Sequence, residues 1–236
     1  MQQYRGIVRV LPNSKLDWTG KIRELPSRLK DPLGWQAPQR IFVNSLSDLF
    51  HEDVRLEFIQ RVFAVMRRAY WHHFQVLTKR SERLLELSPK IDWPENVWMG
   101  VSVEDAARTV RIDHLRRTGA KVKWISIEPL LEPLVKVNLQ GIDWVVIGGE
   151  SGSGARPMDV AWARDLRDQC RTAKITIFMK QLGEAWARAT NAESRKGGEP
   201  SEWPKDLRIR EYPRTLPKHN KGQRWPKMKD TGEAAA

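Results

Sequence analysis

The sequence predicts an α/β protein built as an incomplete (βα) barrel of the TIM type, with about six parallel strands. Short runs of β-branched and aromatic residues alternate along the chain with longer runs that have helical spacing, as in repeated βαβ units. Each short run is almost continuously apolar, which is typical of strands buried on both faces of a parallel sheet.

Six runs are predicted to form the strands: Ile41–Asn44, Phe74–Thr78, Val97–Val103, Val122–Ile127, Trp144–Gly148 and Ile175–Met179. Apolar residues recur at helical spacing between them, from Val54 to Met66, from Ala107 to Leu115 and from Trp162 to Cys170, where Asp159 is a candidate N-cap. A closed eight-stranded barrel needs about 250 residues, so six strands in 236 residues favour an open barrel. A doubly wound sheet is the alternative topology.

The partial barrel is assigned to residues 41–187, preceded by an N-terminal extension of residues 1–40. The extension contains one short apolar run, Ile7–Leu11, and a stretch of helical spacing near Lys21–Leu29. An open barrel leaves an unpaired strand edge, which proteins usually cover. We therefore expect the extension to pack on this edge, with Ile7–Leu11, another chain or a dimer partner covering it.

The C-terminal segment, residues 188–236, is polar, contains Pro and Gly, and shows one weak strand pattern at Leu207–Tyr212, with irregular chain expected beyond about Pro213. Of the formal net charge of +12, the flanks carry most: residues 1–40 hold eight basic and three acidic residues, and residues 188–236 hold twelve and seven. Basic flanks attract polyanions, so nucleic acid is a candidate partner. A solubilising surface is the alternative.

The sequence argues against several other classes of protein. No window approaches eighteen uncharged apolar residues, so no membrane-spanning helix is expected, and the first residues lack the apolar core of a signal peptide. The single cysteine, Cys170, cannot form an internal disulfide or hold an iron–sulfur cluster alone. The single cysteine also favours a reducing, cytoplasmic location. The histidines show no metal-ligand spacing with acidic partners, so we expect no metal site.

Polar residues follow every predicted strand at its carboxyl end, where parallel α/β folds bind their ligands. They are Asn44, Ser45, Asp48, Thr78, Lys79, Arg80, Ser102, Glu104, Ser126, Glu128, Gly148, Gly149, Glu150, Ser151, Lys180 and Gln181. Any one of them could simply begin a loop or cap a helix. Because all six strands share the pattern, we expect one polar pocket.

The segment Gly148–Pro157 is the most specific local indication of a ligand-binding loop, because its glycines let backbone amides approach a ligand or surround an anion. Its glycine spacing matches neither a dinucleotide-binding fingerprint nor a P-loop. A tight strand-to-loop turn is the alternative reading.

Five segments in order resemble a known family: Ile41–His51, Val76–Arg80, Trp98–Glu104, Ile147–Met158 and Phe178–Glu184. Together they resemble an uncharacterised phage- and prophage-encoded family that carries a three-cysteine motif. That family is similar to radical S-adenosylmethionine enzymes, the spore photoproduct lyase among them. The match covers about residues 18–185 and implies a radical-SAM-like barrel with S-adenosylmethionine as its cofactor.

The resemblance also suggests roles for the residues at the strand ends. Four become candidate catalytic residues, with the glutamates holding cations or moving protons and the lysines neutralising phosphate or carboxylate: Lys79, Glu104, Glu128 and Lys180. Nine become candidate cofactor-binding residues, among which the Gly-Gly-Glu run would contact the cofactor's amino group: Asn44, Ser45, Asp48, Ser102, Gly148, Gly149, Glu150, Ser151 and Gln181.

The chain departs from this family in its cysteines. Members usually begin with a segment whose cysteines would ligate a four-iron four-sulfur cluster, whereas the single cysteine here, Cys170, lies elsewhere. The resemblance therefore implies a catalytically incomplete member, with a cluster only if an upstream or separate cysteine-bearing segment supplies the ligands. The alternative is a non-enzymatic protein that binds nucleic acid or another protein through its basic flanks.

Overall fold

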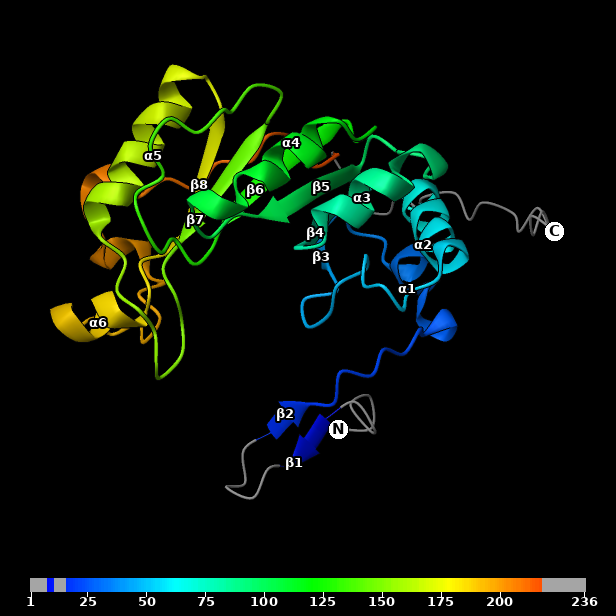
Figure 1. Ribbon diagram of the computed structural model, residues 1–236, viewed down its shortest axis with the longest axis horizontal. Coiled ribbons are helices and arrows are strands. Elements are labelled where there is room, and N and C mark those ends of the chain that lie inside the picture. Colours follow the sequence, from blue (N-terminus) through cyan, green and yellow to red (C-terminus); the bar gives the residue numbers. More distant parts are fainter. Residues whose placement is uncertain (1–7, 11–15, 218–236) are drawn as a thin grey trace.

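A computed structural model describes residues 8–10 and 16–217, and its centre is a six-stranded sheet (Figure 1). The strands are β3 (Arg40–Val43), β4 (His73–Thr78), β5 (Val97–Ser102), β6 (Val122–Ile127), β7 (Trp144–Gly148) and β8 (Thr176–Gln181). Neighbouring strands are parallel and follow one another in chain order across the sheet. The sheet curls into a half-barrel, which confirms the predicted incomplete barrel. A doubly wound sheet is excluded, because its strand order would reverse at a switch point.

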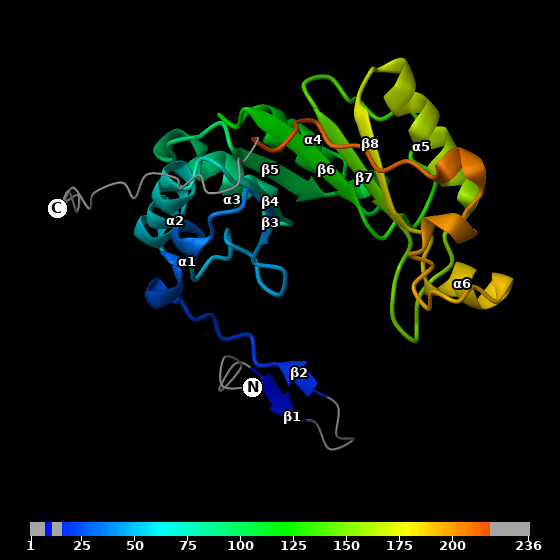
Figure 2. The same ribbon diagram turned by 180° about the vertical axis from the view of Figure 1, so that it is seen from behind.

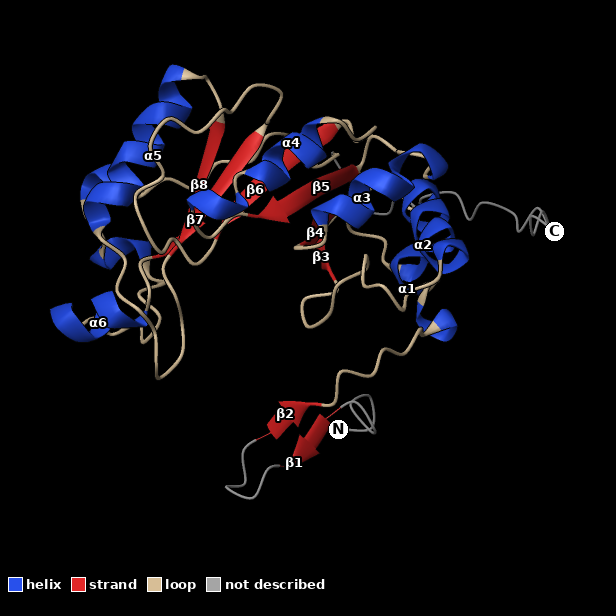
Figure 3. Cartoon of the chain, in the orientation of Figure 1, coloured by secondary structure: helices blue, strands red, loops and turns tan. Residues whose placement is uncertain are grey.

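Helices cover the convex face of the half-barrel (Figure 3). They are α2 (Leu56–Arg68), α3 (Ser81–Leu87), α4 (Val110–Arg116) and α5 (Val160–Thr172), and the chain between β6 and β7 contains no helix. The three predicted helical segments are thus confirmed. So is the predicted cap of α5, since the carboxylate of Asp159 accepts a hydrogen bond of 2.8 Å from the amide of Ala161.

Side chains alternate along each strand between two hydrophobic clusters. In β7, Val145 and Ile147 belong to the main core with the helices, whereas Trp144 and Val146 belong to a smaller cluster on the concave face. Trp98 and Trp124 complete the aromatic floor of this concave face. The period of two in the sequence therefore separates a helix-covered face from a face that points into the half-barrel.

The chain after β8 forms α6 (Glu184–Thr190) and then returns across the sheet (Figure 2). The strand predicted at Leu207–Tyr212 is wrong apart from one antiparallel bridge between Arg210 and Phe178. The first residue of the predicted strand, Leu207, instead ends a 3₁₀ turn that spans Lys205–Leu207. The following residues run antiparallel along β8, where the amide of Met179 donates to Ile209 (2.8 Å) and the amide of Glu211 donates to Ile177 (2.9 Å). They reach the amino end of β7, where the Trp144 indole donates to the carbonyl of Glu211 (3.0 Å). Chain from Pro213 to residue 217 is irregular as predicted, and residues 218–236 lie outside the described residues.

The N-terminal extension differs from the prediction in two respects. Strand β1 (Val8–Val10) pairs antiparallel with β2 (Leu16–Trp18), and these two form a separate sheet (Figure 1). The expectation that Ile7–Leu11 covers the edge at β3 is therefore wrong for Val8–Val10, because their partners are the residues of β2; Ile7 and Leu11 lie outside the described residues.

The helix expected near Lys21–Leu29 is also absent. Residues up to Leu25 are non-helical, and a single 3₁₀ turn spans Pro26–Arg28. Pro26 cannot donate a backbone hydrogen bond and restricts the residue before it to extended conformations, so a helix cannot pass through this point. A short helix, α1 (Asp31–Gly34), follows. Among the described residues, no helix is long and apolar enough to span a membrane.

Candidate functional site

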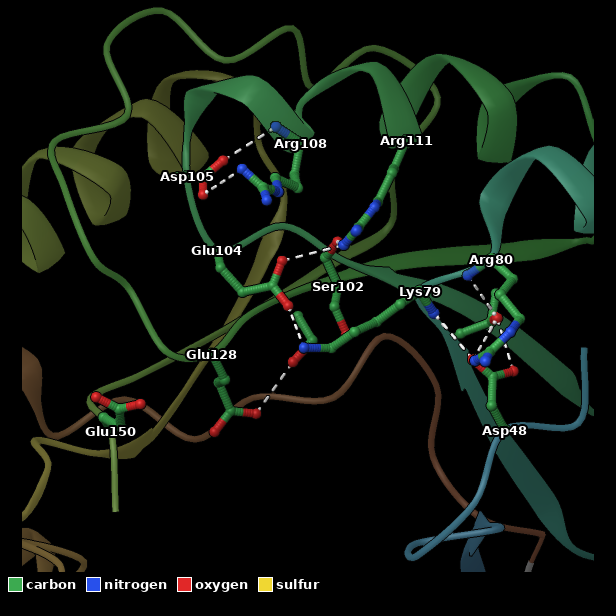
Figure 4. A network of polar contacts seen from close by, with 12 residues as sticks. Asp48, Lys79, Arg80, Ser102, Glu104, Asp105, Arg108, Arg111, Glu128 and Glu150 are labelled. Atoms are coloured by element: carbon green, nitrogen blue, oxygen red, sulfur yellow. Dashed lines mark hydrogen bonds and ion pairs between the residues drawn. The ribbon is translucent and has the colours of Figure 1, made fainter. Parts of the chain in front are cut away.

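The carboxyl ends of the six strands meet along one rim of the half-barrel, because all six strands are parallel. Figure 4 shows the polar side chains at this rim. Glu104 follows β5, Glu128 follows β6 and Glu150 follows β7. The predicted juxtaposition of acidic and basic residues from separate strands is therefore present, and what each carboxylate contacts determines what it can do.

Glu104 is a nearly buried carboxylate between two cations. Its residue is only 8% exposed, and its oxygens contact the ammonium of Lys79, which follows β4, and the guanidinium of Arg111 on α4 (3.0 Å). Arg111 also donates to the carbonyl of Ser102 at 2.8 Å. These contacts hold Glu104 in place, and the two cations leave this part of the rim with a net positive charge.

Glu128 forms the second carboxylate–lysine pair. Its Oε1 lies 3.1 Å from Nζ of Lys180 at the end of β8, and its Oε2 accepts from the hydroxyl of Ser126 at 3.1 Å. Gly148 on the intervening strand β7 makes room for this carboxylate, because a Cβ there would lie 2.6 Å from Oε1 of Glu128. The absence of a side chain at Gly148 therefore lets Glu128 after β6 and Lys180 on β8 form an ion pair that crosses β7.

The side-chain exposures within these two pairs are unequal. The Glu104 and Glu128 side chains are 10% and 16% exposed, whereas those of Lys79 and Lys180 are 60% and 55% exposed. Exposed lysine side chains can leave such pairs at little cost in free energy. The rim therefore presents two fixed carboxylates with lysines that can turn toward a ligand.

The glycine-rich turn after β7 is held together by protein groups. Arg156 donates Nε and Nη2 to Glu150 (2.8 and 2.7 Å), and this pairing lowers the pKa of Glu150 to about 2. The carbonyl of Gly149 accepts from the side-chain amide Nε2 of Gln181 at 2.8 Å, and a Cβ on Gly149 would lie 2.3 Å from the carbonyl oxygen of Leu182. These glycines thus serve the tight strand-to-loop turn that was the alternative reading, while Ser151 is exposed beside them.

The polar residues after β3 mainly fix the conformation of the loop that follows this strand. The carboxylate of Asp48 accepts from the Thr78 hydroxyl (2.7 Å), the amide of Phe50 and the guanidinium of Arg80, and thereby joins this loop to the end of β4. Asn44 adopts the left-handed conformation at φ 57° and opens a turn that also contains the exposed Ser45.

Three charged residues of this region were missed by sequence reasoning: Arg111, Arg156 and Glu184. Arg111 and Arg156 are each the guanidinium partner of a predicted glutamate. The side chain of Glu184, 8% exposed, accepts from the amide of Gly152 (2.8 Å) and contacts Arg188 and Arg195, and the amide of Gly152 is the largest cause that lowers its pKa. Arginines on helices and loops carry no strand-end signal, whereas Glu184 lies three positions beyond Gln181, the last residue of β8, and begins α6.

The described residues do not fit a four-iron four-sulfur cluster. Such a cluster is ligated by cysteine thiolates, and the single cysteine, Cys170, is fully buried inside α5. Burial raises the pKa of its thiol to about 12, so it is protonated at neutral pH. Within residues 8–10 and 16–217, no group of three or more His, Cys, Asp and Glu residues is placed to hold a metal ion.

Fold and rim together define an α/β half-barrel protein with charged groups gathered at the carboxyl ends of its strands. The chain belongs to DUF5131, a family of proteins of unknown function, whose family model matches residues 3–227. No curated protein and no solved structure matches the chain. The expected membership of an uncharacterised family is thereby confirmed, while the phage origin and the similarity to radical S-adenosylmethionine enzymes stay predictions.

Proposed function

We propose that the rim of the half-barrel binds a small ligand that carries both positive and negative charges, with S-adenosylmethionine as the leading candidate. The observation that carries this proposal is the pair of fixed carboxylates, Glu104 and Glu128, each faced by an exposed lysine. A cationic group of a ligand can replace either lysine at its carboxylate. The displaced Lys79 or Lys180 can then neutralise a carboxylate or phosphate of the same ligand.

The concave face below the rim supports the same proposal. Phe42 on β3 lies edge-on to Trp124 and has 44% of its surface exposed, whereas Trp98, Trp124 and Trp144 are buried and support this face from within. Aromatic surfaces stack on planar bases and attract cations such as a sulfonium. Phe42 therefore offers an adenosyl or other nucleotide-like group an exposed aromatic surface on the concave face.

The proposal places the ligand's cationic group at Glu104 and Glu128 rather than at Glu150. Arg156 already occupies both oxygens of Glu150, so a ligand would have to break two charge-assisted hydrogen bonds to reach it. Gly148 and Gly149 contribute indirectly in this scheme, because they let Glu128 and the turn before Glu150 take their positions.

Reductive cleavage of S-adenosylmethionine takes an electron from an iron–sulfur cluster, and the described residues offer no ligand set for one. We therefore propose ligand binding for this chain and derive no reaction step. Any cluster-dependent activity would require cysteines from another segment or chain. The edge of β3, which no described strand covers on its outer side, is where we propose that such a segment or a second copy pairs.

The test is calorimetric titration of the full chain with S-adenosylmethionine and with S-adenosylhomocysteine, which lacks the positive charge on sulfur. We expect S-adenosylmethionine to bind more tightly, and Glu128→Gln to weaken its binding by about tenfold or more, since a hydrogen bond to a charged group contributes about 1.5–3 kcal/mol. The matched control is Glu57→Gln, an exposed glutamate on α2. Absence of binding to the wild type at millimolar ligand, or equal affinities for E128Q and wild type, would contradict the proposal.

Nucleic-acid binding through the flanks is the second candidate. It is favoured by the distribution of charge, because residues 1–40 and 188–236 hold twenty of the 41 Lys and Arg residues. Binding driven by phosphate contacts weakens steeply as salt concentration rises. Gel-shift titrations with single- and double-stranded oligonucleotides at two salt concentrations test this candidate, and affinity that does not change with salt argues against it.

A further inference from the structure

Three buried polar atoms at the base of the half-barrel have no hydrogen-bond partner among the described residues. They are Nε of Arg40, Nδ1 of His73 and Nε1 of Trp98. Buried polar groups in native proteins are almost always hydrogen-bonded, because an unpaired one costs the free energy of its lost hydration. Three such atoms in neighbouring residues indicate a shared partner rather than three independent defects.

The three residues are neighbours on the concave face. Arg40 and His73 are register partners at the start of β3 and β4, and the ring of His73 lies against that of Trp98 on β5, with centroids 4.8 Å apart. The C-terminal segment closes the group from outside. Arg40 donates to the carbonyl of Arg214 (3.3 Å), and its guanidinium lies 3.9 Å from the ring centre of Tyr212.

The chemistry of these atoms defines the missing partner. Arginine and the tryptophan indole are donors only, whereas one nitrogen of histidine can donate or accept. The partner must therefore be a hydrogen-bond acceptor.

The charge of the surrounding groups favours an anion over a water molecule as the missing partner. Arg40 has no carboxylate within ion-pair distance in the described part of the chain. The nearby Arg214 faces only the exposed Glu95, at 3.9 Å. Partly buried positive charge without a counter-charge is costly, and a water molecule supplies an acceptor but no charge.

We propose that the base of the half-barrel binds a small inorganic anion of about chloride size between Arg40, His73 and Trp98. The close approach of the His73 and Trp98 rings and the packing of the Arg40 guanidinium against Tyr212 favour a monatomic or similarly small anion over an organic one. The anion would link β3 to β5 and secure the C-terminal segment beneath them. This site is separate from the rim, because it lies at the opposite, amino ends of the strands.

The test is broadening of the ³⁵Cl nuclear magnetic resonance signal when the full chain is added to chloride solutions. We expect wild type to broaden the signal, and Arg40→Gln to reduce the broadening by about tenfold through loss of the charged donor. Arg61→Gln is the matched control, because it removes the same charge from an exposed position on α2 and should behave as wild type. Equal broadening by R40Q and R61Q would overturn the proposal.

A second measurement needs no substitution and so remains informative if R40Q does not fold. Crystals of wild-type protein are soaked in bromide and measured at the bromine absorption edge. An anomalous peak within hydrogen-bond distance of Arg40 Nε and Trp98 Nε1 supports the site. Density there without anomalous signal identifies a water molecule only, and it overturns the proposal, as does the absence of any density.

Discussion

Lys180 at the end of β8 reaches across β7 to Glu128 at the end of β6, with 3.1 Å between Nζ and Oε1. Gly148 lies beneath this ion pair. We expect Gly148→Ala to displace Glu128, because the added methyl group would lie far inside van der Waals contact of Oε1. The expected result is a loss of stability of about 1–3 kcal/mol together with weaker binding at the rim.

Urea denaturation and ligand titration of Gly148→Ala provide the measurements. The control is Gly154→Ala in the same loop, where an added Cβ would meet nothing within 4 Å. If G148A unfolds and binds ligand like wild type, the position of Glu128 does not depend on the missing side chain at Gly148.

The two partners of the Glu104–Lys79 pair should contribute unequally to stability. Glu104→Gln removes charge from a nearly buried site that Arg111 also contacts, so we expect a loss of about 1–3 kcal/mol. Lys79→Met removes an exposed cation and should cost less than about 1 kcal/mol. Thermal or urea unfolding of both variants checks this order, and a larger loss for K79M than for E104Q would contradict the assignment of Glu104 as the fixed member.

His73 should make the protein less stable in mild acid. Burial is the main cause that lowers its pKa to about 4, and the charges of Arg40 and Arg214 act in the same direction. Below the unfolded pKa of about 6.5 the unfolded chain takes up a proton that the folded chain does not, so stability falls between about pH 6.5 and pH 4 and the loss is complete below pH 4. One pKa unit is about 1.4 kcal/mol, so the loss approaches about 3 kcal/mol.

The measurement is urea unfolding of wild type and of His73→Gln across this pH range. Gluconate as the anion of the buffer keeps small inorganic anions out of the comparison. The free energy of unfolding of wild type, relative to that of H73Q, should fall as pH decreases from 6.5 to 4. A difference that does not change with pH would show that His73 has the same pKa in the folded and the unfolded chain.

Tyr212 should hold the C-terminal segment on the base of the half-barrel. Its ring packs against Trp144 and Phe178, with centroids 5.6 and 5.3 Å apart, and lies under Arg40. We expect Tyr212→Ala to cost about 1–3 kcal/mol and to speed hydrogen exchange at the amide of Met179, which donates to Ile209 in this segment. Leu46→Ala, an exposed side chain at 59%, is the control, and unchanged exchange in Y212A would contradict this role.

The sequence by itself determined the strands and the end of the sheet at which charged residues gather. The apolar runs at Val122–Ile127 and Trp144–Gly148 coincide with β6 and β7, because strands buried on both faces leave a local signal that needs no knowledge of their partners. The elements predicted at Lys21–Leu29 and Leu207–Tyr212 failed because their patterns were weak, and a proline or a packing contact decided their conformation.

Only the tertiary structure decided which groups pair. Lys180 and Glu128 are 52 positions apart, and nothing in either segment indicates that Glu128 would contact a lysine while Glu150 would be taken by Arg156. The same holds for Arg40, His73 and Trp98, whose unpaired nitrogens become neighbours only when β3, β4 and β5 lie side by side. A strand pattern depends on each residue's own burial, whereas a pairing depends on the curvature of the sheet and on the gaps that neighbouring side chains leave.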